Sequence, residues 1–189
     1  MKKSELRTIF KAKREKISPE EISTLSLEIA GNLIAYFKPE GLRISVFLPI
    51  LKFKEVNTYP LIEKLNALNN IICTPVSDLT NGTMKHVVFE KESEIRNNRW
   101  GIPEPVDGPE LLPEQIDMVI VPLLTVDTKG NRVGYGKGYY DRFLSACSPT
   151  TRFVGLYLFE ELSSEIEDVE ETDIPLDFVV TPFKVVECR

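Results

Sequence analysis

Apolar residues recur at steps of three and four in the first part of the chain, the spacing that gathers them on one face of an α-helix. The segment 6–10 has this spacing among lysines and arginines and predicts a helix at the start of the chain. A second helix is predicted from Ser18, which can act as its N-cap, while Glu21 completes a capping box. The apolar stripe of this helix continues to Tyr36, and Pro39 ends it.

Short apolar runs that end in proline or follow turn residues predict the strands of a sheet. We expect strands at residues 43–49, 71–75, 84–89, 117–122, 152–159 and 178–182. Helices are expected from Thr58 to Leu68 and over 139–147. The runs are apolar throughout, which is typical of a parallel sheet that helices cover on both faces. Ligands of such sheets gather at the carboxyl ends of the strands.

The segment 91–115 has no clear periodicity and is rich in proline and glycine, so it is predicted to be a long ordered loop or a lid. No internal repeat or linker divides the chain. Residues 1–189 are therefore predicted to form a single domain.

Composition narrows the class of protein. The 189 residues are 42% hydrophobic and 28% charged, which are ordinary globular values, and the net charge of −6 argues against a polycation that binds nucleic acid. Three widely spaced cysteines form no CxxC pair, so we expect reduced thiols and a cytoplasmic protein. No apolar run suggests a signal peptide or a membrane span.

One segment, residues 121–144, carries a chemical pattern. Gly130, Gly134, Gly136 and Gly138 follow the most apolar strand and precede a predicted helix, and Arg132 and Lys137 lie among them (VPLLTVDTKGNRVGYGKGYYDRFL). Glycines let backbone N–H groups approach an anion, so the segment predicts a phosphate cradle. It matches neither the Walker A pattern nor GxGxxG. A glycine-rich turn without a ligand is the alternative.

Asp141 directly follows this segment and would repel a phosphate by itself. A Mg²⁺ ion resolves the conflict, because it binds a carboxylate on one side and phosphate oxygens on the other. A carboxylate that only stabilises the first turn of a helix is an equally good explanation.

The segment 130–141 strongly resembles the signature of the 5-formyltetrahydrofolate cyclo-ligase (methenyltetrahydrofolate synthetase) family. Further similar elements occur in the same order: Lys3 with Leu6-Arg7, Phe47-Leu48-Pro49 with Glu55, Trp100-Gly101-Ile102-Pro103-Glu104-Pro105, and Asp173-Ile174-Pro175-Leu176-Asp177 with Val179-Val180-Thr181-Pro182.

The resemblance implies a three-layer α/β/α fold with a mainly parallel central sheet, of the NagB/RpiA/CoA transferase-like class. It also implies an ATP- and Mg²⁺-dependent ligase that cyclises 5-formyltetrahydrofolate to 5,10-methenyltetrahydrofolate and releases ADP and phosphate. The γ-phosphoryl group would activate the formyl oxygen, and N10 of the folate would attack. Enzymes of this kind position groups and stabilise charge.

The same resemblance assigns residues. The catalytic residues would be Lys137, Arg132 and Tyr139. The ATP-binding residues would be Lys3, Arg7, Arg132, Val133, Gly134, Tyr135, Gly136, Lys137, Gly138, Tyr139 and Tyr140. The substrate-binding residues would be Leu48, Glu55, Trp100, Tyr135, Gly136, Lys137, Gly138 and Tyr139. Asp141 and Asp173 would hold Mg²⁺, with Asp177 as the second choice and more suited to a structural role.

Several of these residues have plainer explanations without the resemblance. Lys3 and Arg7 would belong to a solvated helix start, and Trp100 would be a packing residue. His86 is expected to be a packed or surface histidine. Tyr135 stands where some relatives carry arginine, which leaves open how the glutamate tail of the folate is held.

Two rival functions remain. One is another ATP-dependent ligase or kinase with a different acceptor, and the other is a non-catalytic protein that binds folate or nucleotide. Under the favoured hypothesis the partners are the small molecules ATP and 5-formyltetrahydrofolate, with no nucleic acid or membrane partner, and the chain is expected to be a monomer.

Overall fold

The computed structural model describes residues 1–78 and 80–189. The helices are α1 (Lys3–Glu15), α2 (Pro19–Phe37), α3 (Tyr59–Ala67) and α4 (Tyr139–Leu144), with 3-10 turns η1 (Leu51–Phe53) and η2 (Pro113–Gln115). The strands are β1 (Arg43–Ser45), β2 (Ile71–Asp78), β3 (Thr83–Val88), β4 (Ile95–Asn97), β5 (Pro103–Pro105), β6 (Glu110–Leu111), β7 (Met118–Pro122), β8 (Thr125–Val126), β9 (Arg132–Val133), β10 (Arg152–Leu156), β11 (Phe178–Val180) and β12 (Val185–Glu187).

The start of α2 follows the capping box that the sequence predicts. The Ser18 hydroxyl accepts a hydrogen bond from the Glu21 N–H at 3.1 Å, and the Glu21 carboxylate accepts one from the Ser18 N–H at 2.8 Å. Lys38 ends the helix in a left-handed conformation with φ 45°. The predicted long helices are thus confirmed, whereas α4 ends three residues before its predicted end.

The central sheet has the strand order β12-β11-β10-β7-β1-β2-β3-β6. Its five middle strands, from β11 to β2, run parallel, as predicted. The edges do not, because β12 is antiparallel to β11 and both β3 and β6 are added antiparallel beyond β2. The connection from β2 to β3 is too short for a parallel crossover, which needs about a dozen residues, so β3 returns as a hairpin partner.

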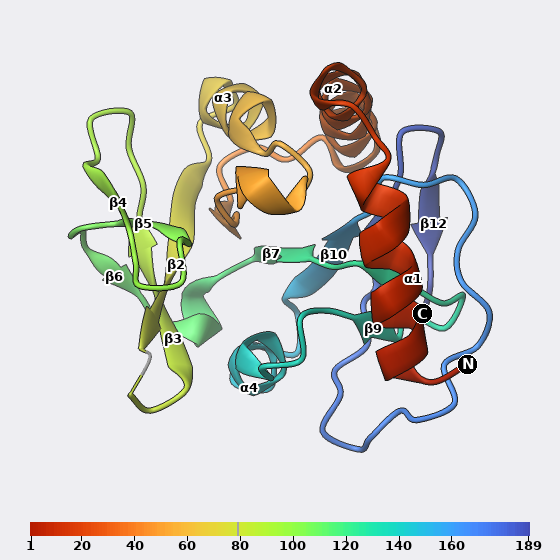
Figure 1. Ribbon diagram of the computed structural model, residues 1–189. Helices are drawn as coiled ribbons and strands as arrows, with labels where there is room; N and C mark the ends of the chain where they lie inside the picture. Colours follow the sequence, from red (N-terminus) through yellow and green to blue (C-terminus); the bar gives the residue numbers. More distant parts are fainter. Residues whose placement is uncertain (79) are drawn as a thin grey trace.

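Two hydrophobic clusters on opposite faces of the sheet define three layers. Along β7, Met118 and Ile120 pack into the cluster under α2 and α3. Val119 and Val121 alternate with them and pack into the cluster under α1 and α4. Figure 1 shows α2 and α3 on one side of the sheet and α4 on the other. The predicted α/β/α sandwich is confirmed.

The expectation of a loop over residues 91–115 is wrong. This segment contains the β4–β5 hairpin, β6 and η2. Pro103 and Pro105 lie in β5, in a sheet of only two strands, where each strand has a free edge that tolerates proline. The β8–β9 hairpin and β12 were also not predicted, and β1 ends at Ser45 rather than at residue 49.

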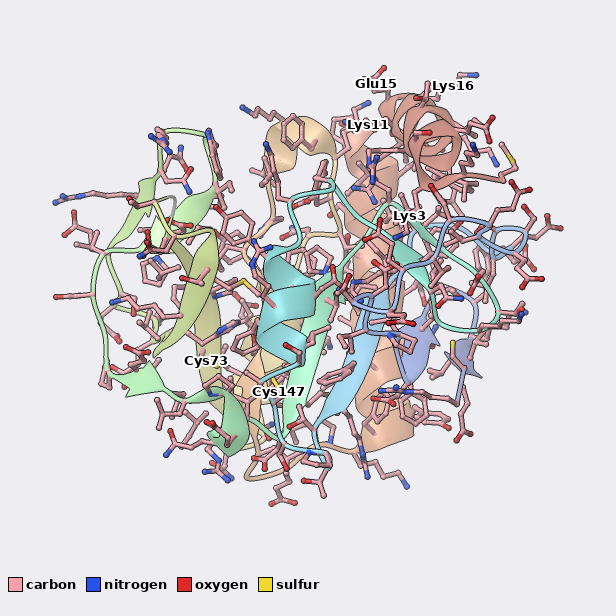
Figure 2. The ribbon with its side chains drawn as sticks, turned by 90° about the horizontal axis from the view of Figure 1, so that it is seen from below. Lys3, Lys11, Glu15, Lys16, Cys73 and Cys147 are labelled. Atoms are coloured by element: carbon pink, nitrogen blue, oxygen red, sulfur yellow. The ribbon has the colours of Figure 1, made fainter. Side chains whose placement is uncertain are left out.

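The cysteines are free thiols, as their spacing predicts. Figure 2 labels two of them, Cys73 and Cys147, in a view from below in which α4 lies across the sheet. Within the described ranges, no helix is both long enough and apolar enough to cross a lipid bilayer.

His86 fixes α4 against the sheet. Its imidazole is fully buried in β3 and stacks on Phe143 of α4, with ring centroids 3.8 Å apart. Neither ring nitrogen has a hydrogen-bond partner. Burial lowers the pKa of His86 from 6.5 to about 3, so the folded protein holds this ring neutral. The packed histidine expected from the sequence is confirmed.

Replacing His86 with phenylalanine should weaken the pH dependence of stability. The unfolded chain takes up the proton near pH 6.5 and the folded protein only near pH 3, so the wild type loses stability as the pH falls between these values. Between pH 7.5 and 5.5 this loss is about 1.4 kcal/mol. Urea unfolding at both pH values measures it; an equal loss in His86→Phe would contradict the assignment.

Candidate active site

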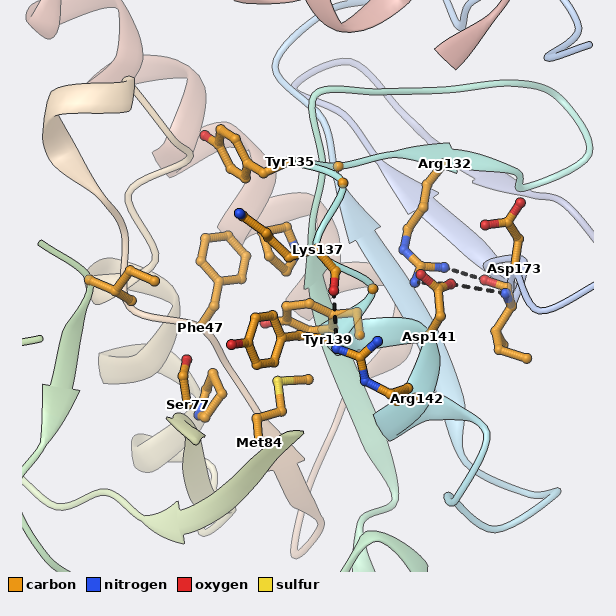
Figure 3. Close-up of a pocket in the computed structure, with 18 of the residues that line it drawn as sticks. Phe47, Ser77, Met84, Arg132, Tyr135, Lys137, Tyr139, Asp141, Arg142 and Asp173 are labelled. Atoms are coloured by element: carbon orange, nitrogen blue, oxygen red, sulfur yellow. Dashed lines mark hydrogen bonds and ion pairs between the residues drawn. The ribbon is translucent and has the colours of Figure 1, made fainter. Parts of the chain in front are cut away.

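The main cavity, of about 860 Å³, opens at the carboxyl ends of the parallel strands. Phe47 and Leu48 follow β1, Ser77 lies near the end of β2, and Pro122 ends β7, and all four line it. The remaining wall comes from α1, the β4–β5 hairpin, the glycine loop with α4, and residues 170–174. Figure 3 shows this cavity with its labelled side chains.

The glycine loop uses its glycines in different ways. Gly136 and Gly138 have φ angles of +84° and +69°, in the region that favours glycine, and both line the cavity. Gly134 lines it too but has no positive φ. Gly130 lies outside the cavity wall, where a side chain would collide with the carbonyl oxygen of Leu176.

Helix α1 presents two cations to this loop. The Arg7 Nε donates a hydrogen bond of 2.8 Å to the Gly134 carbonyl oxygen. The Lys3 ammonium forms an ion pair with Asp173. Because they are four residues apart on one helix, Lys3 and Arg7 share a face and both line the cavity. The structure therefore excludes a solvated helix start for these two residues.

Arg132 joins three segments of the site. Its side chain is only 7% exposed and forms an ion pair of 2.7 Å with Asp141 Oδ1. It also donates a hydrogen bond to the Ile174 carbonyl oxygen, while the Ile174 N–H donates to Asp141 Oδ1 at 3.1 Å. The dashed lines of Figure 3 mark these contacts between the loop, α4 and the 173–174 segment.

The two predicted metal ligands line the same cavity, but each already has a cationic partner. Asp141 pairs with Arg132, and Asp173 pairs with Lys3. In the part of the chain that the structure describes, no group of three or more His, Cys, Asp or Glu side chains could hold an ion alone. Because Mg²⁺ keeps waters and needs only one or two carboxylates besides substrate phosphates, these residues fit an ion that arrives with a nucleotide.

Asp177, the second choice for a metal ligand, has a structural position. Its carboxylate accepts hydrogen bonds from the Phe153 N–H at 2.7 Å and from Arg189 Nε at 2.6 Å. It is not part of the cavity wall. It connects β10 to the C-terminal strand region.

Trp100 lies beyond β4 in the β4–β5 hairpin, at the cavity rim, and is 38% exposed. Its ring meets that of Tyr139 edge to face at 6.4 Å, and Lys137 Nζ lies 5.6 Å from the centroid of its ring. The structure thus places Trp100 beside the glycine loop rather than in the core. This arrangement provides a flat surface next to a cation.

Glu55 is a buried carboxylate of the cavity wall, only 5% exposed. It accepts a hydrogen bond of 2.7 Å from the Ile50 N–H. Burial raises the pKa of Glu55, and the Ile50 N–H and the Arg14 cation oppose that rise. Burial, together with the charge of Glu55, also raises the pKa of the Tyr135 and Tyr140 hydroxyls.

Two of the predicted ATP-binding residues, Val133 and Tyr135, pack against other side chains of the protein. Val133 is 1% exposed and packs into the core under α1 and α4, so its side chain is not part of the cavity wall. Tyr135 lines the cavity but packs against Phe53 at 5.5 Å between ring centroids, and its hydroxyl is buried without a partner. The Val133 side chain cannot contact a nucleotide in that cavity, because the core covers it.

Sequence reasoning missed Arg142 and Glu104, which also line the cavity. Arg142 donates to the Lys137 carbonyl oxygen at 3.0 Å and to that of Gly82, which ties the glycine loop to the region before β3. Glu104 accepts hydrogen bonds from the Ser77 N–H at 2.9 Å and from Asn98 Nδ2 at 3.0 Å. Their only sequence signal was their position beside recognised motifs.

These features define an α/β enzyme that brings several cations and a hydrogen-bonding, aromatic wall to one cavity. The 5-formyltetrahydrofolate cyclo-ligase family profile matches residues 1–182. The chain belongs to this family.

Individual relatives agree with this assignment. A 5-formyltetrahydrofolate cyclo-ligase of Escherichia coli (strain K12) is 33% identical over 184 residues, covering 95% of this chain and 100% of the relative. The solved structure of the Aquifex aeolicus 5,10-methenyltetrahydrofolate synthetase has a TM-score of 0.77 and 30% identity, over 100% of this chain and 94% of that one. The Mycoplasma pneumoniae synthetase, at 23% identity, supports the fold with a TM-score of 0.74 over 96% of this chain and 99% of that one.

Gly136→Ala should damage the site through Arg7. A methyl group at Gly136 would lie 3.1 Å from the Arg7 guanidinium, and the positive φ adds strain of about 1–2 kcal/mol. We expect a KM for ATP at least about tenfold higher, because displaced charge binds phosphate less well. Gly41→Ala is the matched control, since Gly41 has φ +66° with open space around it. Equal kinetic effects of the two variants would refute the argument.

Proposed function

We propose that this chain cyclises 5-formyltetrahydrofolate to 5,10-methenyltetrahydrofolate in an ATP- and Mg²⁺-dependent reaction. Membership of the family supports the reaction. The observation that carries it at the level of residues is the shared cavity, in which the cations of α1 and the glycine loop face the wall formed by Leu48, Glu55 and Trp100.

The chemistry requires activation of a poor leaving group. The formyl oxygen attacks the γ-phosphorus of ATP, and the bond to the β,γ-bridging oxygen breaks to release ADP. N10 then attacks the formyl carbon and closes the ring, and the phosphorylated oxygen leaves as phosphate. The N10 proton is lost, and the product carries the methenyl bridge. The protein therefore has to position two substrates and stabilise transferred charge.

Four cationic side chains of the cavity wall suit the phosphate groups of ATP: Lys3, Arg7, Arg132 and Lys137. Lys137, Arg132 and Tyr139 would act at the reacting groups, where Lys137 Nζ lies 5.6 Å from the centroid of the Trp100 ring and Tyr139 is in edge-to-face contact with Trp100. Lys3 and Arg7 bind the phosphates from α1, and the loop residues 134–140 contribute backbone contacts.

Asp141 and Asp173 would hold Mg²⁺ together with phosphate oxygens and water. Both carboxylates line the cavity beside the cations that bind phosphate. The ion would neutralise charge on the β- and γ-phosphates when it is bound.

The folate would lie against Leu48, Glu55 and Trp100. An ionised Glu55 accepts two hydrogen bonds from the N–H groups of the pterin edge, and its buried position makes these bonds strong. Trp100 and Tyr139 provide flat faces for the pterin or aminobenzoyl ring. Tyr135 offers no positive charge to the glutamate tail of the folate, unlike the arginine that some relatives carry at this position.

The rival functions lack support from the geometry. A ligase or kinase with another acceptor would need neither Glu55 nor Trp100, yet both line the same cavity as the phosphate cations. We infer one domain acting as a monomer in the cytoplasm, with ATP and the folate as its partners. The free cysteines suit a reducing compartment.

Near-UV absorbance of the protein with 5-formyltetrahydrofolate, Mg²⁺ and ATP tests the reaction, because the methenyl product has a band that the substrate lacks. We expect a rise that needs both ATP and protein, and a reduction of at least about 100-fold in Lys137→Ala. Lys85→Ala, on the exposed side of β3, is the surface control. No rise with ATP still bound would point to another acceptor, and an active Lys137→Ala would remove the assigned role.

Asp141→Asn should raise the Mg²⁺ concentration needed for half-maximal turnover by about tenfold or more, because a neutral amide binds the ion less well. Titration of Mg²⁺ at saturating ATP measures this change, and Asp107→Asn on the surface serves as the control. An unaltered Mg²⁺ requirement would exclude Asp141 as a ligand.

A further inference from the structure

Arg14 is a cation inside the protein for which the proposed reaction gives no role. It lies in the last turn of α1 and is only 3% exposed. One of its terminal nitrogens donates a hydrogen bond of 2.5 Å to the Leu123 carbonyl oxygen, while its Nε has no partner. No carboxylate among the described residues forms an ion pair with it. Burying an unpaired charge costs free energy. A negative charge that stabilises Arg14 would therefore act over a distance longer than that of an ion pair.

Arg14 lies outside the main cavity and is linked to its wall through Tyr135. Arg14 and Tyr135 line a second, smaller cavity of about 260 Å³, whereas Tyr135 and Glu55 line the main cavity. Tyr135 therefore lines both the main cavity and the smaller one. In Figure 3 its hydroxyl points away from Lys137 and Asp141. This hydroxyl is buried, and its pKa responds to the charges of both Glu55 and Arg14.

The groups around Glu55 come from four segments. The Ile50 N–H, from the turn before η1, donates a hydrogen bond to its carboxylate, and Tyr135 of the glycine loop and Tyr140 of α4 line the same cavity. Arg14 of α1 lies on the other side of Tyr135, and its charge acts on Glu55 from there. Arg14 is the only full positive charge among these four. Burial favours the protonated form of Glu55, and the cation of Arg14 favours the ionised form.

We propose that Arg14 is a positioning residue for folate binding that acts through Glu55, by holding a positive charge behind this carboxylate and behind the ring of Tyr135. This inference rests on the proposed folate role of Glu55. An ionised carboxylate can accept two hydrogen bonds from the pterin edge, whereas a protonated one offers a donor where the pterin also has donors. Arg14 would thus support substrate recognition without touching the substrate.

The test compares Arg14→Met with the wild type in steady-state kinetics at pH 6.5 and pH 8.5. Without the cation the pKa of Glu55 rises further, so the KM for 5-formyltetrahydrofolate should exceed that of the wild type at pH 6.5 and approach it at pH 8.5. The KM for ATP should change less than about twofold. Arg14→Lys should restore most of the folate affinity, and Lys16→Met, which removes an exposed charge beyond the end of the same helix, should have no effect.

A KM change that is equal for ATP and folate, or that is independent of pH, would overturn the proposal and indicate a role in packing only. The variant Glu55→Gln separates the proposed role of Glu55 in folate binding from the proposed role of Arg14. If Glu55→Gln leaves the folate KM unchanged, the proposed role of Glu55 fails; if it raises this KM while Arg14→Met does not, only the role of Arg14 fails.

A second measurement covers the case in which Arg14→Met does not fold. Arg14→Gln can keep the hydrogen bond to Leu123 and removes only the charge. Quenching of Trp100, the single tryptophan of the chain, measures folate binding without ATP. We expect weaker binding at pH 6.5 than at pH 8.5 in Arg14→Gln. The same pH dependence in the wild type and in this variant would contradict the proposal.

Discussion

The ion pair between Arg132 and Asp141 is the interaction on which the site depends. It joins the glycine loop to α4, and the backbone of Ile174 binds both members of the pair. The Arg132 side chain is only 7% exposed, so loss of the Asp141 carboxylate would leave a largely buried cation without its counter-charge. These contacts therefore hold the loop in one conformation relative to α4 and the 173–174 segment. Such preorganisation is how an enzyme stabilises charge without reorganising during the reaction.

The sheet beneath the site explains why this arrangement can be rigid. Its five parallel strands are covered on both faces, and the loops that carry chemistry leave from their carboxyl ends. His86 adds a contact between β3 and α4 that keeps this helix against the sheet. Movement is therefore expected in the β4–β5 hairpin rather than in the glycine loop, because this hairpin pairs only with itself.

Local signals made much of the fold predictable. The capping box of Ser18 and the apolar stripe of α2 involve residues close in sequence, and so do the apolar runs of the central strands. The β8–β9 hairpin and β12 were missed because strands of two or three residues depend on distant partners more than on their own composition. In the site, helical spacing predicted that Lys3 and Arg7 lie on one face of a helix. Only the family resemblance predicted that this face lines a nucleotide site. Arg14 was not singled out from the sequence, since burial is not visible in a basic stretch.

The pair of Lys3 with Asp173 has a consequence for how the protein becomes an enzyme. The two residues are 170 positions apart, so this ion pair closes a loop of nearly the whole sequence. A nascent chain exposes Lys3 almost at once, but it has no complete cavity until the segment around residue 173 leaves the ribosome. Completion of the cavity is thus an outcome of the last stage of synthesis, and a chain that terminates before this segment would lack both the Asp173 wall and strands β11 and β12.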